Sequence, residues 1–200
     1  MVPGYIDIKE IHRGRRRIIY RGLREKDGKP VVIKTVIDDY PTPADLDYLQ
    51  HEYDVLKVLN NDGVVNAYSL ETLGNKHALI LEDIGGKSLK YIIASERLDL
   101  ITVLKIVLKL FTTLEELHLN DVIHKDLNPK NIIVNSATNK VQLIDFSISS
   151  RLQSEIQKIS HPDLLEGTLA YMSPEQTGRM NRSVDYRTDF YSLGVTFMKC

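Results

Sequence analysis

The stretch that decides the fold is residues 122–147, which read VIHKDLNPKNIIVNSATNKVQLIDFS. Two apolar runs within it, 132–134 and 141–144, have the length of strands and are separated by polar turn residues, so they predict a small β-hairpin. In an antiparallel hairpin the start of one strand lies beside the end of the other. Asn131, just before the first run, and Asp145, just after the second, are therefore predicted to lie at the same end.

Asn131 and Asp145 carry carbonyl and carboxylate oxygens, the hard ligands that Mg²⁺ prefers. Asp126 lies five residues before Asn131, on the loop that leads into the hairpin. A carboxylate in this place could accept the proton of a substrate hydroxyl or orient that hydroxyl. Loop Asp and Asn residues are usually turn formers or caps. The joint spacing of these three, bracketed by apolar strands, nevertheless favours a site for phosphoryl transfer.

The residues before this stretch predict a sheet and one helix. Thr42, Pro43 and Asp45 are typical of a helix start, with an N-cap, a proline in the first turn and an acidic residue at N3. The helix is expected to run to about Asn60. Around it lie short apolar runs that predict an antiparallel sheet: 18–20, 31–37, 67–73 and 78–81.

After Gly85 and Gly86 the pattern becomes mainly helical, with a long helix over 99–120 and a last apolar helix from about Asp189. Strands first and helices later predict an α+β fold in two lobes, a small antiparallel sheet lobe with one helix and a mainly helical lobe. We expect the lobes to span residues 1–84 and 85–200 of one domain.

Glu52 lies within the apolar stripe that Leu49, Leu56 and Leu59 form on the first helix. An unpaired buried charge is costly, so Glu52 is expected to have a cationic partner, and Lys34 in the strand 31–37 is the candidate. The alternative is a glutamate at the edge of the stripe that reaches solvent.

Bulk composition excludes several classes of function. A formal net charge of −1 gives no field that favours nucleic acid or an anionic membrane. The one cysteine, Cys200, permits neither an intramolecular disulfide nor a cysteine zinc cluster, which fits a cytoplasmic protein. The N-terminus lacks a signal-peptide pattern, and charged residues interrupt the most apolar stretch, 98–119, so that a buried helix is predicted and not a membrane span.

These motifs together resemble the protein kinase domain of the serine/threonine type, whose motif set includes a strand lysine, a helix glutamate, H-R-D-L-x-x-x-N, D-F-G and A-P-E. The resemblance implies that Lys34 holds ATP phosphates and pairs with Glu52, and that Asp126 is the catalytic base. It assigns Mg²⁺ to Asn131 and Asp145. It also assigns nucleotide contacts, with Lys34, to Gly14, Ile19, Glu82 and Ile84.

Two further segments carry the resemblance. Residues 167–175, GTLAYMSPE, are similar to the substrate-docking end of the activation segment, and 189–194, DFYSLG, to the start of a buried helix. Pro3-Gly4-Tyr5 and the run 167–182 are most similar to the kinase domain at the N-terminus of large bacterial sensor proteins. Those proteins continue into an ATPase module and a histidine kinase, which are expected as partners beside ATP and a protein substrate.

The sequence departs from the kinase pattern in several places. Only Gly14 remains of the glycine-rich loop G-x-G-x-x-G-x-V, so phosphate contacts there would have to use charge. Lys125 stands in the arginine position of H-R-D, Asn128 in a place where these kinases commonly have a phosphate-facing lysine, and Ser147 in that of the D-F-G glycine. Because family members continue with more helices, the domain is expected to be truncated at Cys200, and the isolated chain to be aggregation-prone.

Three functions remain open at this level. The first is ATP-dependent transfer of the γ-phosphoryl group to a protein serine or threonine in bacterial signalling. The second is a weakly active or inactive nucleotide-binding scaffold, favoured by the eroded glycine loop, Asn128 and Ser147. The third is a small-molecule phosphotransferase, which shares the H-x-D-x-x-x-x-N loop, but residues 167–175 argue against it because a peptide-docking segment serves no small substrate.

Overall fold

The computed structural model describes residues 2–59, 61–151, 168–178 and 182–198. The chain divides into two compact units, Met1–Asn60 with Val65–Gly86 and Asn61–Val64 with Lys87–Cys200. The first is a sheet with one helix and the second is mainly helical, which confirms the predicted α+β class. Gly167 and Cys200, on which predictions above depend, lie outside the described residues.

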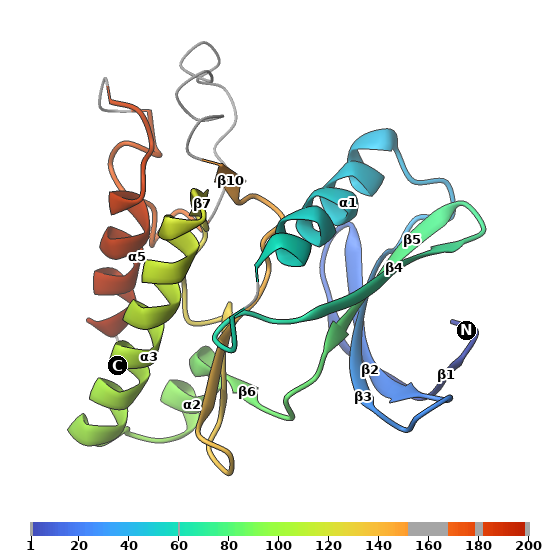
Figure 1. The fold of residues 1–200 in the computed structure, drawn as a ribbon, viewed down its shortest axis with the longest axis horizontal. Helices are drawn as coiled ribbons and strands as arrows, with labels where there is room; N and C mark the ends of the chain where they lie inside the picture. The colour runs from blue at the N-terminus through green and yellow to red at the C-terminus, as the bar shows by residue number, and fades with distance from the viewer. Residues whose placement is uncertain (1, 60, 152–167, 179–181, 199–200) are drawn as a thin grey trace. The chain divides into compact units, whose positions relative to one another are not determined.

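The first unit is built on a five-stranded antiparallel sheet (Figure 1). The β-branched runs predicted as strands all lie in it. The edge strand β1 was missed, because it is mostly exposed, charged residues interrupt its apolar ones, and two register shifts against β2 break its period. In spatial order the strands are β1 (Tyr5–Arg13), β2 (Arg17–Arg24), β3 (Pro30–Val36), β5 (Lys76–Glu82) and β4 (Ala67–Leu73).

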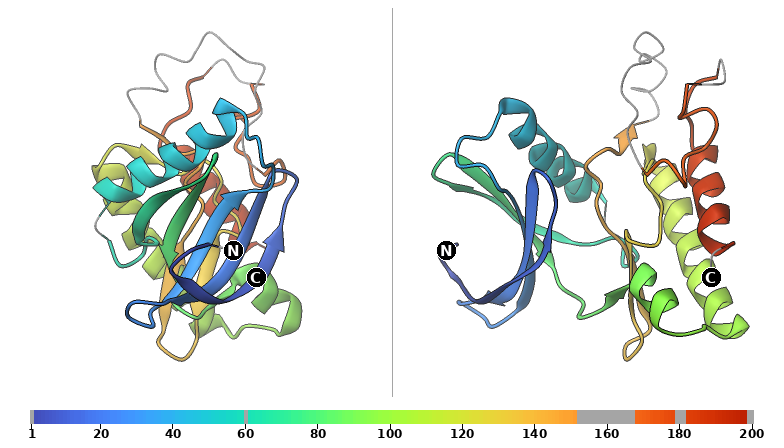
Figure 2. Two further views of the ribbon diagram at one scale, coloured as in Figure 1. Left: turned by 90° about the vertical axis from the view of Figure 1, so that its right-hand side faces the viewer. Right: turned by 180° about the vertical axis from the view of Figure 1, so that it is seen from behind.

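Helix α1 (Pro43–Val58) packs on this sheet, where it contacts β3, β4 and β5 (Figure 2). Its start forms a capping box: the Asp45 backbone N–H donates to Thr42 Oγ1 at 3.3 Å, and the Thr42 N–H donates to the Asp45 carboxylate at 3.2 Å. The helix therefore begins where the sequence predicts, and its buried face includes Leu49, Leu56 and Glu52.

The second unit contains the helices α2 (Leu89–Ser95), α3 (Leu100–Leu119) and α5 (Arg187–Phe197). The predicted hairpin is present as β8 (Ile132–Asn135) and β9 (Lys140–Leu143), joined at its edge by β6 (Lys87–Ser88). A separate two-stranded ladder pairs β7 (Val122–Ile123) with β10 (Ser150–Arg151). Helix α2 and the two-residue strands were not predicted, because they are too short to show a period.

Helix α3 forms the core of the second unit through Ile106, Leu110, Leu114 and Leu117, all buried. Phe111 stacks on Phe190 of α5 with ring centroids 6.0 Å apart. The opposite flank of α3 is apolar and exposed. Among the described residues, no helix combines the length and the apolar character that spanning a membrane requires.

The backbone at Gly63 packs closely against helix α3. Its carbonyl accepts from the Leu143 N–H at 2.8 Å, which ties residues 61–64 to β9. A Cβ at Gly63 would lie 1.9 Å from Thr113 Oγ1 and 3.0 Å from Thr113 Cβ, and Thr113 is buried on α3. The glycine is therefore required by close packing, because any side chain there would push against the helix.

We expect Gly63→Ala to lower the free energy of unfolding by about 1–3 kcal/mol, the usual cost of overpacking a core. Gly194 is the matched control, because it lies inside α5 and a Cβ there meets nothing within 4 Å. Gly194→Ala should stabilise by about 0.5–1 kcal/mol, since alanine is the better helix former. Urea denaturation of both variants checks the pair, and equal stability of Gly63→Ala and wild type would contradict the close approach.

Candidate active site

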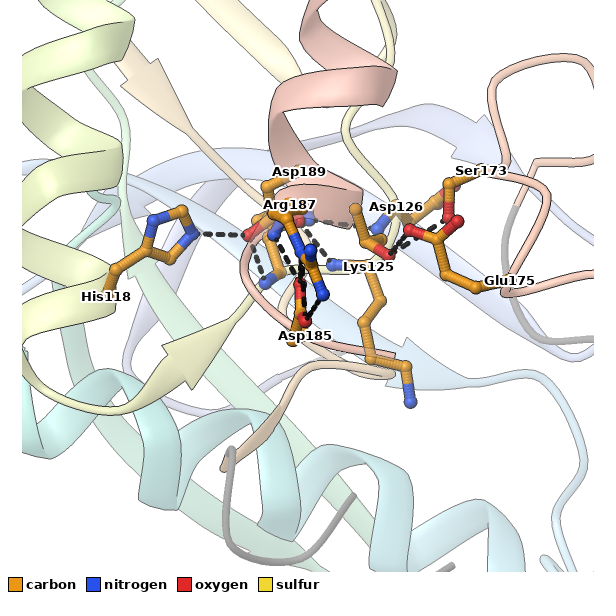
Figure 3. Close-up of polar contacts among 10 residues, drawn as sticks. His118, Lys125, Asp126, Ser173, Glu175, Asp185, Arg187 and Asp189 are labelled. Carbon is orange, nitrogen blue, oxygen red and sulfur yellow. Dashed lines mark hydrogen bonds and ion pairs between the residues drawn. The ribbon is translucent and has the colours of Figure 1, made fainter. Parts of the chain in front are cut away.

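The loop that carries Asp126 follows β7 and leads into β8. Its start is held by Asp189, a fully buried residue in the first turn of α5. The Asp189 carboxylate accepts the N–H groups of His124 at 3.0 Å and Lys125 at 2.9 Å, and it lies 2.9 Å from His118 Nε2 on α3 (Figure 3). Two helices therefore fix the backbone just before Asp126.

The Asp126 carboxylate is itself placed by two hydrogen bonds. Oδ1 accepts from the Thr168 N–H at 2.8 Å, and Oδ2 accepts from Asn131 Nδ2 at 2.9 Å. Asp126 is only partly buried. A carboxylate held in one orientation and still reached by solvent has the properties of a general base.

Asn131 and Asp145 lie at the same end of the β8–β9 hairpin, as its strand order predicts. The Ile144 N–H donates to the Asn131 carbonyl at 3.0 Å, and Asp145 follows directly. Asp145 has a left-handed backbone, with φ of 64°, and Ser147 Oγ donates to its Oδ1 at 2.8 Å. A non-glycine residue in this region is strained, and such strain is frequent at functional sites.

The donor set at this end fits Mg²⁺. The side-chain Nδ2 of Asn131 donates to Asp126. No described residue donates a hydrogen bond to Asn131 Oδ1, so this side-chain oxygen is available to a metal ion. The described residues contain no cluster of three or more His, Cys, Asp or Glu side chains that could hold a metal. Asn131 and Asp145 would share Mg²⁺ with ligand phosphates and water, because this ion usually binds through one or two protein oxygens and keeps such ligands.

Asn128, which stands where related kinases commonly have a phosphate-facing lysine, makes contacts within the loop. It is almost fully buried, and its Nδ2 donates to the Asp126 carbonyl at 3.0 Å and to Thr168 Oγ1 at 3.2 Å. Its Oδ1 accepts from the Lys130 N–H at 2.9 Å. Asn128 therefore connects the loop that carries Asp126 with Thr168 through hydrogen bonds.

The segment 168–178 is fixed to α5 as well as to the loop. Thr188 Oγ1 donates to Glu175 Oε1 at 3.0 Å and lies 3.0 Å from Ser173 Oγ. Beside it, Arg187 forms an ion pair with Asp185 at 2.5 Å, and this guanidinium lowers the pKa of the Asp185 carboxyl. Glu175 thus accepts a hydrogen bond from a hydroxyl group of α5.

In the first unit, Lys34 on β3 and Glu52 on α1 form an ion pair. Lys34 Nζ lies 2.6 Å from Glu52 Oε2, and both side chains are almost completely buried. The position of Glu52 in the apolar stripe predicts this pair, and the alternative of a solvent-reaching glutamate is wrong. What the pair does in catalysis stays a prediction.

The remaining predicted nucleotide contacts lie on the same unit. Ile19 on β2 pairs with Lys34, Glu82 at the end of β5 pairs with Val31, and Ile84 follows β5. Gly14 begins the β1–β2 turn, where its N–H donates to the Arg17 carbonyl at 2.9 Å. Their role as nucleotide contacts stays a prediction.

The arginines around that turn are engaged within the unit. Arg13 pairs with Glu10 at 2.6 Å, Arg16 with Asp45 at 3.3 Å, and the Arg17 guanidinium lies 5.0 Å from the centre of the Tyr48 ring. The Arg13 and Arg16 side chains remain more than half exposed in these pairs, so the turn is a basic surface of the unit.

Sequence reasoning missed three residues that build this site: Asp189, Thr168 and His118. Asp189 was noted only as the start of a helix, because it follows Arg187 and Thr188 and has the pattern of an acidic residue in a first helical turn. Thr168 acts through its backbone N–H, which leaves no trace in the sequence. His118 was missed because, in the sequence, it is one polar residue among several in a long predicted helix.

Comparison with known proteins agrees with this geometry. A family model described as the protein kinase domain matches residues 5–200. A probable serine/threonine-protein kinase of Clostridium perfringens is 29% identical over 187 residues, covering 92% of this chain and 27% of the relative. Another of Clostridium acetobutylicum is 25% identical over 189 residues, covering 94% and 28%.

Human serine/threonine-protein kinase D2 is 29% identical over 188 residues, covering 91% of this chain and 20% of the relative. The chain thus spans between a fifth and about a quarter of the length of these relatives. Because the family model covers nearly the whole sequence, the chain belongs to the protein kinase family.

Proposed function

We propose that the chain transfers the γ-phosphoryl group of ATP, with Mg²⁺, to the hydroxyl group of a serine or threonine in a protein substrate. The observation that carries the proposal is the orientation of the Asp126 carboxylate by Thr168 and Asn131. The backbone of Asn131 in turn binds Ile144, the residue before Asp145. The names of the relatives support the choice of serine and threonine.

In this mechanism Asp126 accepts the proton of the substrate hydroxyl group. At the same time the oxygen of that hydroxyl group forms a bond to the γ-phosphorus. The bond between the γ-phosphorus and the β–γ bridging oxygen breaks, and ADP leaves. Asn131 and Asp145 would hold Mg²⁺, which supplies neutralisation of the charge on the phosphates. Lys34, oriented by Glu52, would contact the α- and β-phosphates. Positioning and electrostatic stabilisation contribute most of the rate in such transfers.

The segment 168–178 supports a protein substrate over a small molecule. It reaches the Asp126 carboxylate through Thr168 and is fixed to α5 through Glu175. A segment held beside the base in this way can dock an extended peptide. The rival function, a nucleotide-binding scaffold, is favoured by one observation: Gly14 is the only glycine left in the phosphate-covering loop.

The test is transfer of radiolabelled γ-phosphate from ATP with Mg²⁺, using the full-length protein and dephosphorylated casein as acceptor. Label in casein or in the chain itself, recovered as phosphoserine or phosphothreonine, is the expected result. Nucleotide binding without transfer would favour the scaffold, and label that appears only in hydroxylated small molecules would favour the third class.

We further propose that the domain acts in bacterial signalling in the cytoplasm, within a larger protein that carries ATPase and histidine kinase modules. This finer assignment rests on the likeness of Pro3-Gly4-Tyr5 and residues 167–182 to such sensor proteins. Reading the coding DNA beyond codon 200 tests it, because the two modules should follow in the same frame.

Ser147 is expected to tune the metal site. Ser147→Ala removes the hydrogen bond to Asp145 Oδ1 and should raise the Mg²⁺ concentration at half-maximal transfer by about 10-fold or more, as loss of a hydrogen bond to a metal ligand commonly does. A Mg²⁺ titration of transfer, together with Mg²⁺-dependent ATP binding by calorimetry, measures it. Ser149→Ala is the control, because Ser149 Oγ donates to the Phe146 carbonyl and should affect stability alone. An unchanged Mg²⁺ dependence in Ser147→Ala would contradict the prediction.

A further inference from the structure

Lys125, the residue before Asp126, has an unusual backbone. Its φ is 68°, in the left-handed region, which costs a non-glycine residue about 1 kcal/mol or more. Both of its peptide groups are held by other parts of the unit. Its N–H donates to Asp189 Oδ1 at 2.9 Å, and its carbonyl accepts from Gln176 Nε2 at 2.8 Å. A strained conformation persists only where surrounding contacts determine it, and these two contacts do so here.

The Gln176 amide is fixed at both of its polar atoms. Its Oε1 accepts from the Ser173 N–H at 3.1 Å, so that its Nε2 is directed to Lys125. Ser173 is fully buried and lies 3.0 Å from the hydroxyl of Thr188 on α5. Gln176 therefore extends from a turn that is fixed to α5. Its amide connects the segment 168–178 with the backbone of the loop that carries Asp126.

The hydrogen bond from Gln176 to the Lys125 carbonyl lies at the peptide group that precedes Asp126. The Lys125 carbonyl belongs to the same peptide plane as the Asp126 N–H, which donates to His124 Nδ1 at 3.3 Å. The Asp126 carbonyl is bound by Asn131 and Asn128. Loss of the Gln176 donor would release one side of this peptide. Rotation of the peptide would carry the Asp126 side chain away from Thr168 and Asn131.

We propose that Gln176 is a positioning residue for catalysis: with Asp189 it clamps the Lys125 peptide and thereby sets the direction of the Asp126 carboxylate. The inference deepens the proposed function and rests on it. It also gives the segment 168–178 a second role beside substrate docking, because a shift of this segment would change the orientation of the base.

The most informative variant is Gln176→Glu, because the glutamate side chain has nearly the same shape as that of glutamine. The ionised carboxylate can still accept from Ser173 but has no proton to donate to the Lys125 carbonyl. We expect kcat to fall by about 10- to 100-fold, the scale of a misplaced catalytic group, while KM for ATP changes less than about 2-fold. Gln176→Ala should give a similar fall in kcat. The far-UV circular dichroism spectrum and melting curve show whether each variant is folded.

The pH profile separates positioning from general loss of structure. In Gln176→Glu the introduced carboxyl group regains a donor when it is protonated. The ratio of kcat in this variant to kcat in wild type should therefore rise as the pH falls toward the reference carboxyl pKa of about 4.3. The charged and ionisable groups around the site are the same in both proteins, so their contribution to the pH dependence largely cancels in the ratio: Asp126, Glu175, Asp189, His118 and His124. Gln176→Ala should show no such rise.

Thr112→Val is the matched control, because Thr112 Oγ1 donates to the Leu108 carbonyl at 3.1 Å on α3, outside the segment 168–178. It should keep wild-type kcat. A folded Gln176→Glu with wild-type kcat, or a flat ratio across pH, would overturn the inference while leaving the proposed function intact. Absence of transfer in wild-type protein would instead refute the proposed function itself.

Discussion

Replacement of Asp126 by asparagine is expected to reduce kcat for phosphoryl transfer by about 10²- to 10⁴-fold, the usual contribution of a general base. The amide cannot accept the hydroxyl proton, but its oxygen can still accept the Thr168 N–H that binds Oδ1 in the wild type. The fold should therefore persist. The measurement is kcat at saturating ATP and Mg²⁺ with a protein acceptor.

Asp121→Asn provides the control for this change. Asp121 is exposed, lies five residues upstream and has a left-handed backbone with φ of 58°, which asparagine adopts readily. The control should keep wild-type kcat and stability. Equal rates for Asp126→Asn and wild type would mean that Asp126 is not the base, and a scaffold function would then account better for the chain.

The features predictable from sequence are those encoded over a few neighbouring residues. The capping box at Thr42 and Asp45, the β8–β9 hairpin and the helix over Leu100–Leu119 each have a local pattern of turn residues or apolar spacing. The pairing of Lys34 with Glu52 follows from energetics, because a glutamate in an apolar stripe requires a nearby cation.

The features that sequence could not predict depend on contacts between distant segments. Asp189 binds the backbone of His124 across 65 residues, and Gln176 binds Lys125 across 51. In both contacts a side chain meets a backbone group, and backbone groups are the same at every position. The loop contacts of Asn128 were also not predictable, because its position in the kinase pattern shows only that a lysine is replaced, while its burial and its bond to Thr168 depend on a segment 40 residues away.

Loss of the buried cation at Lys34 is expected to have the largest effect on stability. Lys34→Met leaves the Glu52 carboxylate, which has no exposed surface, without its lysine. Breaking a buried ion pair from one side commonly costs about 3–5 kcal/mol, so urea denaturation should show a fall of that size in the unfolding free energy. Lys76→Met is the control, since Lys76 pairs with the exposed Asp39 at 2.7 Å and should cost less than about 1 kcal/mol.

The double variant Lys34→Met/Glu52→Leu separates stability from catalysis. Replacing both charges by apolar side chains of similar size should restore most of the lost stability, because a buried ion pair is often no more stable than a packed apolar pair. Phosphoryl transfer should not return, since methionine carries no charge for the phosphates. Recovery of transfer together with stability would show that Lys34 acts only in folding. A single Lys34→Met variant as stable as wild type would show that the buried pair contributes little.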